Sequence, residues 1–354
     1  MNKRFFAALL AAMVLTAAAF AQDFPAYLKI EGTVITGCYK DDLPDNLVIP
    51  EGVTEIGESV FRECMYLESV VIPGSVKVIG GNSYDGGAFS GCTSLKSVTI
   101  PEGVETIDDW AFSGCASLAD VTIPEGVTEI GGGAFKGCTS LASVTIPGSV
   151  KEIGGIDRGG DFFGALFEDC TSLKSVTLAE GVEQICYGMF RGCTSLESIK
   201  IPGSVTTIGE GAFSSCTSLV SVTIPESVTA IERGAFSGTG LKTVAIPKGV
   251  KVISNGAFTY CKSLESVTIP RGVTEIGREA FIDCKSLKSV SIPRSVTTID
   301  YSAFSKCGNL TVQYDGTKVQ WKAIKKDEPI FYNTQVTKIN CSDGEFSKQD
   351  WYKS

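Results

Sequence analysis

Apolar residues recur along this chain with a period of 23 residues, and the copy from Leu118 to Ser140 shows the pattern most clearly. It reads L-x-x-V-x-I-P-x-x-V-x-x-I-x-x-x-A-F-x-x-C-x-x, where x varies between copies. Its phenylalanine can be followed through eleven copies: Phe61, Phe89, Phe112, Phe135, Phe167, Phe190, Phe213, Phe236, Phe258, Phe281 and Phe304. Seven of the ten steps are 23 residues long, and the others are 28, 32 and 22. A fixed period of about 20–29 residues indicates a solenoid in which each repeat forms one coil.

Within each repeat the pattern changes from strand-like to turn-like. The segment L-x-x-V-x-I alternates apolar and polar residues and is rich in β-branched side chains, which predicts a short strand. Proline ends this strand because it cannot donate to a strand ladder, and the Pro-Glu-Gly or Pro-Gly-Ser that follows favours a turn. V-x-x-I then crosses the back of the coil as an extended or one-turn segment, and A-F-x-x-C fills the space between the two sides. A lone coil buries too few apolar side chains to offset the entropy lost in ordering its backbone, so neighbouring coils must stack.

Both ends of the array depart from the repeat, and we expect them to cap it. Residues 22–46 contain two short runs around Glu31-Gly32, which predict a hairpin over the first coil. Eleven repeats occupy residues 47–309. Residues 310–354 are expected to form a C-terminal cap, in which Thr311–Tyr314 is a strand and Trp321 and Phe331 cover the last coil.

The first 21 residues are expected to be a signal peptide for export. Lys3 and Arg4 precede an apolar run over residues 5–19, and Ala19-Phe20-Ala21 is a small-residue cleavage site. This run is shorter than the ~20 residues of a spanning helix, so we expect no membrane span. We therefore expect an exported protein at the cell surface or secreted, or alternatively a periplasmic one.

The repeat and both ends resemble the BspA-type leucine-rich repeat family of bacterial surface antigens. The resemblance extends from about Tyr27 to Phe346 and includes the segment Ile49–Gly57 and the closing Asn340–Gly344. It implies a right-handed, leucine-rich-repeat-like solenoid, rich in β-strands, with short turns or helical turns on its convex side. It also implies contact with other proteins, because members are associated with adhesion to host matrix proteins and with contact between bacteria. The chain departs from ordinary leucine-rich repeats in lacking an asparagine ladder after the strand.

Charge and composition exclude some partners. The chain carries 31 basic and 40 acidic residues, and loss of Lys3 and Arg4 with the signal leaves 29 − 40 = −11. An acidic surface repels phosphate backbones, so we expect no nucleic-acid binding. At 43% hydrophobic residues the chain can bury a core and is not of the disordered class.

The thirteen cysteines would suggest a disulfide framework in an exported protein, but their positions argue for core packing. Ten of them lie three residues after the repeat phenylalanine: Cys64, Cys92, Cys115, Cys138, Cys170, Cys193, Cys216, Cys261, Cys284 and Cys307. We expect mostly reduced, buried thiols at this slot. The sequence leaves the state of Cys38, Cys186 and Cys341 open, since they lie outside this row.

The residue types of common catalytic and metal sites are largely missing. The chain has no histidine, which excludes the Ser-His-Asp and Cys-His catalytic arrangements and the commonest metal ligand. It has no phosphate-binding glycine loop and no C-x-x-C pair, and its glycine runs fall in the turn slot of the repeat. We expect no enzyme activity, no cofactor and no metal site.

Two regions are candidates for binding. On either side of the buried valine, the strands carry rows of serine and threonine, such as Ser97 and Thr99, which suit a half-exposed sheet and would also offer a polar platform for a protein or glycan. Two insertions break the period between I-G and A-F, and insertions at one slot of a solenoid emerge on one face. They supply the predicted partner-binding residues Tyr84, Asp85, Arg158, Asp161 and Phe162. Neutral variation in loop length is the alternative explanation of these insertions.

These observations predict an exported, non-enzymatic protein that contacts another protein, either a host extracellular-matrix protein or a bacterial surface protein. A periplasmic or envelope scaffold with a bacterial partner and a carbohydrate-binding module are the alternatives. The identity of the ligand and the oligomeric state stay open at this point.

Overall fold

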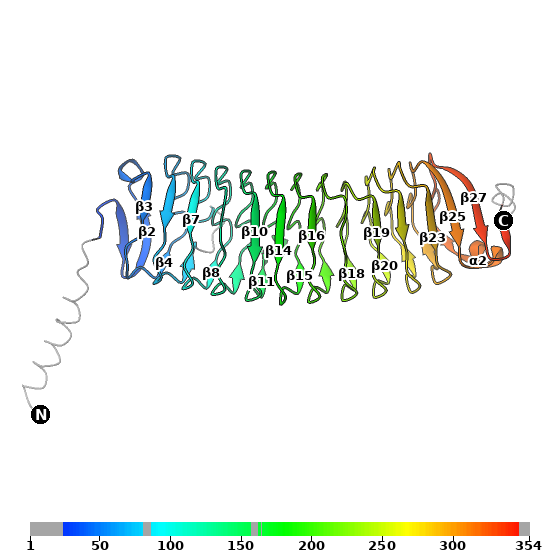
Figure 1. The fold of residues 1–354 in the computed structure, drawn as a ribbon, viewed down its shortest axis with the longest axis horizontal. Helices are drawn as coiled ribbons and strands as arrows, with labels where there is room; N and C mark the ends of the chain where they lie inside the picture. Colours follow the sequence, from blue (N-terminus) through cyan, green and yellow to red (C-terminus); the bar gives the residue numbers. More distant parts are fainter. Residues whose placement is uncertain (1–23, 81–85, 157–161, 164, 347–354) are drawn as a thin grey trace, which may run out of the picture.

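The chain folds into an elongated solenoid whose two ends lie far apart (Figure 1). The computed structural model describes residues 24–80, 86–156, 162–163 and 165–346. A typical repeat forms one coil with a short strand on each of two faces and turns between them. Strands dominate, and the described chain contains a single α-helix, α2 (Lys318–Ala323). The predicted strand-rich repeat coil is confirmed.

The L-x-x-V-x-I segments form the first face, which we call the Ser/Thr face. Neighbouring strands are parallel and in register, so that Ser143, Ser175 and Ser198 lie side by side. Alternation along each strand buries the valine and isoleucine slots and exposes the positions between them. The strands of this face are β3 (Asn46–Val48), β5 (Ser69–Val71), β7 (Ser97–Thr99), β10 (Ser143–Ile146), β14 (Ser175–Leu178), β16 (Ser198–Lys200), β19 (Thr243–Ala245), β21 (Ser266–Thr268), β23 (Ser289–Ile292), β25 (Asn309–Tyr314), β27 (Gln335–Cys341) and β28 (Gly344–Phe346).

The V-x-x-I segments form a second face, and the extended form expected for them is the one observed. Most strands here have two residues and pair in parallel with the next coil, as Glu55-Ile56 does with Val78-Ile79. The ladder is interrupted after β11 and after β18, the two places where the period becomes 32 and then 22 residues. The strands are β1 (Leu28–Glu31), β2 (Val34–Cys38), β4 (Glu55–Ile56), β6 (Val78–Ile79), β8 (Thr106–Ile107), β9 (Glu129–Ile130), β11 (Glu152–Ile153), β15 (Gln184–Ile185), β17 (Thr207–Ile208), β18 (Ala230–Ile231), β20 (Val252–Ile253), β22 (Glu275–Ile276), β24 (Thr298–Ile299) and β26 (Lys325–Lys326).

Elements outside the repeat lie at the two ends. The expected N-terminal hairpin is present, because β1 pairs antiparallel with β2, and β2 continues in parallel with β4 of the first coil. A 3-10 turn, η1 (Lys40–Asp42), follows the hairpin. At the other end β27 pairs in parallel with β25, and β28 closes the Ser/Thr face as an antiparallel edge.

A column of stacked phenylalanine rings runs through the core. Adjacent centroids are 5.0–5.9 Å apart, and adjacent ring planes differ by 1–27°. The eleven repeat phenylalanines are fully buried, and in the described chain Phe331 adds a further ring on Phe304. Trp321 is also buried and packs edge-on against Tyr314 at 5.3 Å. The column therefore extends one ring beyond the last repeat.

Turns flank this column, and their backbone explains where glycine recurs. In most coils the residues two before and two after the phenylalanine have positive φ, for example Gly133 (62°) and Gly114 (71°). Glycine adopts this left-handed region without the steric cost that other residues meet. Trp110 and Tyr260 adopt it nonetheless, with φ of 59° and 58°. The turn interpretation of the glycines is confirmed at these positions.

Candidate functional site

The five residues predicted to bind a partner fall in the two insertions. Tyr84, Asp85, Arg158 and Asp161 lie outside the described residues. Phe162 belongs to β13 (Phe162–Phe163), whose backbone pairs antiparallel with β12 (Gly155–Ile156) directly after the second-face strand of the same coil. The grouping of the five side chains stays a prediction.

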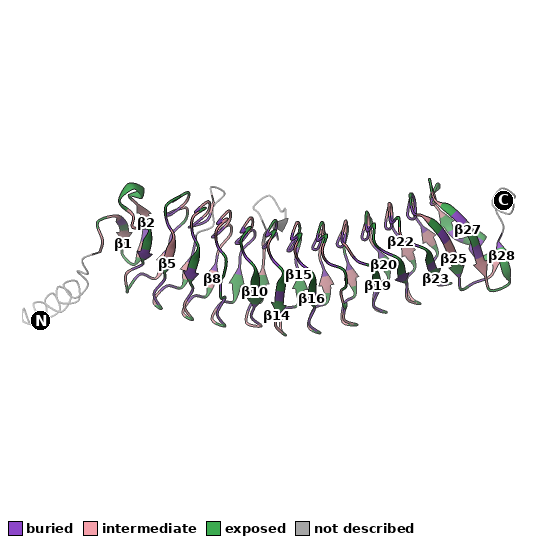
Figure 2. Cartoon of the chain, turned by 45° about the horizontal axis from the view of Figure 1, so that its top comes forward, coloured by how far each residue is buried: buried purple, intermediate pink, exposed green. Residues whose placement is uncertain are grey.

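The Ser/Thr face is an outward surface that follows the length of the solenoid, and exposed positions recur on its strands (Figure 2). The two hydroxyl rows predicted from the repeat are exposed in the middle coils, as at Ser175 and Thr177. Valine replaces threonine at the N-terminal end, where Val48 and Val71 are neighbours. The face therefore has a uniform hydroxyl-rich middle and chemically distinct ends.

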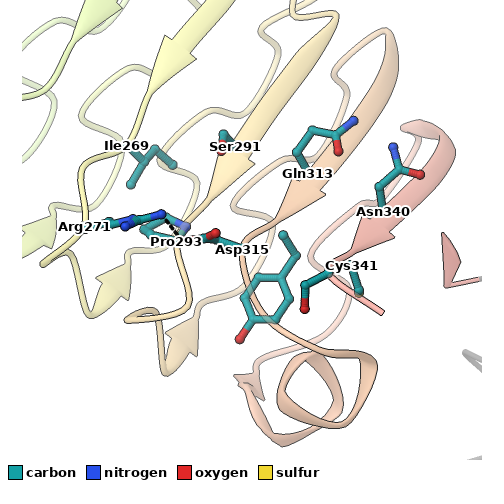
Figure 3. Close-up of a pocket in the computed structure, with 10 residues that line it drawn as sticks. Ile269, Arg271, Ser291, Pro293, Gln313, Asp315, Asn340 and Cys341 are labelled. Atoms are coloured by element: carbon teal, nitrogen blue, oxygen red, sulfur yellow. Dashed lines mark ion pairs between the residues drawn. The ribbon is translucent and has the colours of Figure 1, made fainter. Parts of the chain in front are cut away.

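A cleft opens at the C-terminal end of this face, and we call it the C-terminal cleft (Figure 3). Its volume is about 420 Å³. Ser291, Gln313 and Asn340 line it from β23, β25 and β27, and the strand register makes them direct neighbours. At its edge Arg271 reaches over an intervening coil to Asp315, with 3.0 Å between Nη2 and Oδ2. The cleft thus combines two amides and a hydroxyl with a guanidinium–carboxylate pair.

Hydrogen-bonding capacity is the chemistry that the C-terminal cleft offers. Each amide side chain can both donate and accept, which suits a peptide backbone or the hydroxyls of a sugar. Cys341 also lines the cleft, but burial and the neighbouring Asp343 raise the pKa of its thiol. A raised pKa favours the thiol form of the sulfur over the nucleophilic thiolate.

Sequence reasoning missed this cleft, although the residues carry a signal for it. Gln313 and Asn340 stand at the slot that threonine fills in most coils, and Asp315 follows Tyr314 where the preceding coil has Pro293. These residues come after the last regular repeat, so the 23-residue period could not show which residues of the preceding coil they lie beside.

A second cleft, of about 380 Å³, lies at the opposite end of the molecule between the η1 segment and the first coil's turn. We call it the N-terminal cleft. Its apolar lining comes from Leu43, Pro44, Met65, Tyr66 and Leu67. Its charged lining comes from Lys40, Asp41, Asp45 and Glu63. The cleft therefore combines apolar side chains with charged groups that are mainly acidic.

The thiol row faces the core, as predicted. Nine of its ten sulfurs donate to the carbonyl oxygen of the phenylalanine in the preceding coil, at 3.0–3.3 Å. Burial raises the pKa of Cys138 and of Cys216 to about 12. Thr239, which replaces cysteine in one coil, departs from this pattern, because its hydroxyl donates to the Phe236 carbonyl of its own coil at 2.9 Å. All thirteen cysteines are free thiols in this structure.

Carboxylates gather on the second face near the first insertion. Burial, with Glu129, Asp109 and Glu55 nearby, raises the pKa of Asp108 to about 6. Burial and the neighbouring Glu152 also raise the pKa of Glu129. Within the described ranges no three His, Cys, Asp or Glu side chains are arranged to hold a metal ion.

Comparison with known proteins agrees with this geometry. The family model described as "BspA type Leucine rich repeat region (6 copies)" matches residues 33–155, 164–264 and 251–349. The chain belongs to the BspA-type leucine-rich repeat family. This member of the family builds its repeat from coils with a strand on each of two faces, a column of phenylalanines and a row of cysteines.

Two solved leucine-rich repeat structures with TM-scores above 0.5 show the same fold. A leucine-rich repeat protein from Bacteroides ovatus is 23% identical with a TM-score of 0.61, over 88% of this chain and 99% of that one. One from Eubacterium ventriosum is 20% identical with a TM-score of 0.54, over 88% and 92% of the two chains. A leucine rich cell surface protein from Faecalibacterium prausnitzii is 30% identical with a TM-score of 0.45, over 86% and 99%. No curated protein matched the sequence.

Across the residues that the structure describes, no helix has the length and apolarity to cross a bilayer.

Proposed function

We propose that this BspA-type leucine-rich repeat protein is exported and makes non-enzymatic protein–protein contacts at the bacterial surface, by adhesion to host matrix proteins or to other cells. Repeat solenoids typically serve as scaffolds with extended binding surfaces. The signal-like residues 1–21 support export, and the family supports a surface role. A periplasmic or envelope scaffold is the alternative location for the same kind of contact.

The observation that carries the proposal is the continuous Ser/Thr face. It presents a strand or bridged segment from each coil to solvent, with the same polar side chains repeated along the solenoid. Its middle lacks large anchoring side chains, whereas interface hot spots are enriched in Trp, Tyr and Arg. We therefore propose that the insertions supply the anchors through Tyr84, Asp85, Arg158, Asp161 and Phe162, and that the face supplies surrounding polar contact.

Location and partner are tested on intact cells. Protease treatment of whole cells should cut the protein if it is on the surface and spare it if it is periplasmic. A pull-down with the chain from Gln22 onward should then recover a matrix or surface protein. Full protection of the chain on cells with intact outer layers would reject the surface role and favour the envelope scaffold.

The binding region is tested with two matched variants. Trimming both insertions to the regular 23-residue spacing should weaken partner binding at least about tenfold, because anchor residues dominate interface energy. The melting temperature should change little, because both insertions lie outside the repeated core. Gln313→Ala with Asn340→Ala, which alters the C-terminal cleft and leaves the insertions intact, is the control. If only the control variant loses affinity, the partner binds at the cleft.

The C-terminal cleft favours a second candidate function, which is carbohydrate binding. Gln313, Asn340 and the Arg271–Asp315 pair offer the donors and acceptors that sugar hydroxyls need. A glycan array with the unaltered protein and with Gln313→Ala/Asn340→Ala tests it. Signals that persist in the double variant would exclude the cleft as the sugar site.

A further inference from the structure

The two most exposed large hydrophobic side chains of the described chain lie at opposite ends of the solenoid. Tyr66, in the turn after the first coil, is 83% exposed, and Val319, on α2, is 76% exposed. The next in order is Val48, at 60%. Among the interior repeats the most exposed large apolar side chain is Tyr260, at 52%, so the two ends present the most accessible apolar groups of the described chain.

Charge changes sign between the same two ends. Residues 24–240 contain 12 basic and 28 acidic residues, which gives 12 − 28 = −16. Residues 241–346 contain 15 basic and 10 acidic residues, which gives 15 − 10 = +5. The solenoid is therefore acidic over its N-terminal two thirds and basic over its C-terminal third.

The N-terminal cleft joins an exposed apolar anchor to carboxylates. Tyr66 and Met65 are both exposed, and they line the cleft together with Asp41 and Asp45. Neither aspartate forms an ion pair within the part of the chain that the structure describes. The one cation that lines the cleft, Lys40, donates through Nζ to the backbone carbonyl of Arg62. An apolar group flanked by cations fits this cleft.

Helix α2 presents that combination. Val319 and Lys322 are exposed one turn apart, and Lys325 is exposed just beyond the helix. Residues 318–326 contain four lysines and no acidic residue. The helix is held on the body of the protein, because buried Trp321 packs on Tyr314 and the Lys318 backbone N–H donates to Asp343 at 2.8 Å. Six helical residues span only about 9 Å, so this helix is short enough to enter a small cleft.

We propose that α2 of one copy docks into the N-terminal cleft of a second copy, with Val319 against Tyr66 and Met65, and lysines facing Asp41 and Asp45. The two surfaces are different and lie at opposite ends (Figure 1). Such a heterologous contact does not close on itself unless the rotation between copies forms a ring, so the chains assemble end to end. This assembly is separate from partner binding and does not depend on the proposed adhesion.

Sedimentation velocity on the chain from Gln22 onward tests the assembly. The average sedimentation coefficient should keep rising between about 5 and about 200 µM without stopping at the dimer, as for a weak, open association. Raising sodium chloride from about 50 mM to about 500 mM should reduce the association at least severalfold, because exposed charges are screened.

Two single substitutions at opposite ends give the decisive comparison. Tyr66→Asp disables the cleft, and Val319→Glu disables the helix, so each variant alone should remain monomeric. In an equimolar mixture of the two variants, Tyr66→Asp still has an intact helix and Val319→Glu still has an intact cleft. The mixture should therefore form a heterodimer and nothing larger. Val220→Glu, at a partly exposed valine of a middle coil, should assemble like the unaltered protein. Circular dichroism melting shows whether each variant is folded.

Three results would overturn the proposal. The unaltered protein could stay monomeric up to the highest concentration. Folded Tyr66→Asp or Val319→Glu could assemble alone, which would place the contact elsewhere. The mixture could grow beyond the dimer, or form none, which would exclude pairing between these two surfaces. A monomeric protein whose cleft binds a lysine-rich apolar peptide would assign the cleft to another chain.

Discussion

At the scale of single residues, the repeated cysteine combines apolar packing with a hydrogen bond. The carbonyl of each repeat phenylalanine accepts from the backbone N–H three residues on, and the thiol of the next coil is a second donor, as Cys115 and Cys138 show at Phe112. A hydrogen bond within a protein contributes about 0.5–1.5 kcal/mol. A small side chain with a donor therefore suits this slot, and Thr239 also donates there, although to the Phe236 carbonyl of its own coil.

Substitution of Cys138 separates the two roles of this slot. Cys138→Ala should lower the free energy of unfolding by about 0.5–1.5 kcal/mol, because the Phe112 carbonyl loses the thiol donor and keeps only the backbone N–H of Cys115. Cys138→Ser keeps a donor of similar size and should be the more stable of the two variants. Urea denaturation monitored by circular dichroism measures both. A serine variant that unfolds at lower urea than the alanine variant would show that apolar packing alone decides the residue.

Asp108 is the residue whose ionisation most clearly opposes folding. Its pKa is raised to about 6 in the folded protein from an ordinary value of 3.8, mainly by burial and then by nearby carboxylates. Between these values the folded state holds more protons than the unfolded state, so stability falls as pH rises through about 4 to 6. Above that window the loss is complete.

Asp108→Asn should remove this dependence. The variant should match the unaltered protein at about pH 4, where the carboxyl is protonated, and exceed it at about pH 8. We expect a gain of about 1 kcal/mol, which is well below the full value of the shift because the half-exposed group is screened by solvent. Urea unfolding at the two pH values measures it. Equal stabilities at pH 8 would mean that Asp108 does not oppose the fold.

At the scale of the element, the coil is the unit that stacks. Its strands pair only with the coils before and after it, and Phe135 stacks on Phe112 at 5.4 Å and on Phe167 at 5.7 Å. Stability is then approximately a sum of coil and nearest-neighbour terms. One whole coil can be lost if its two neighbours can stack on each other, whereas one missing side chain leaves a void that stacking cannot close.

Deletion of residues 118–140 should therefore be tolerated better than Phe135→Ala. The deletion joins Ser117 to Leu141 in the regular order and lets Phe112 stack on Phe167. The substitution leaves a buried cavity that costs about 3–5 kcal/mol. Thermal unfolding of both proteins measures the difference. If the deletion variant fails to fold while Phe135→Ala melts like the unaltered protein, the coil is not an independent stacking unit.

At the scale of the whole molecule, the ends decide whether the stack is closed. Each interior coil has two covered sides, but the last repeat depends on elements outside the period. Phe331 stacks on Phe304 at 5.9 Å, Trp321 packs on Tyr314, and β27 pairs with β25. Terminal units of a solenoid need such covers to stay soluble.

A chain that ends at Asp315 should consequently aggregate or melt at a markedly lower temperature. It exposes the ring of Phe304 together with the free edge of β25, and unpaired strand edges promote association. The 118–140 deletion serves as the control, since it shortens the repeat array by one coil and keeps both ends. Size-exclusion chromatography and thermal unfolding compare the two. A monodisperse truncated protein with an unchanged melting temperature would show that the last coil needs no cover.

The sequence alone determined the periodic part of this protein. The slots of Phe135 and Cys138 recur because every coil must fill the same interior space, so burial at one coil predicts burial at all. The hydroxyl rows, the N-terminal hairpin and the cover by Trp321 and Phe331 also followed from local pattern and turn chemistry. Such features depend on side chains close together in the chain or equivalent between coils.

The tertiary structure decided what breaks the period. Gln313 and Asn340 become neighbours only through the register of β25 and β27, which shifts at Leu310/Thr311, and Arg271 reaches Asp315 across a coil. The raised pKa of Asp108 likewise depends on carboxylates brought together by stacking. A repeat pattern specifies which side chains enter the core, because burial is a property of each coil. It does not specify which exposed side chains meet, because that depends on how irregular segments align at the ends of the stack.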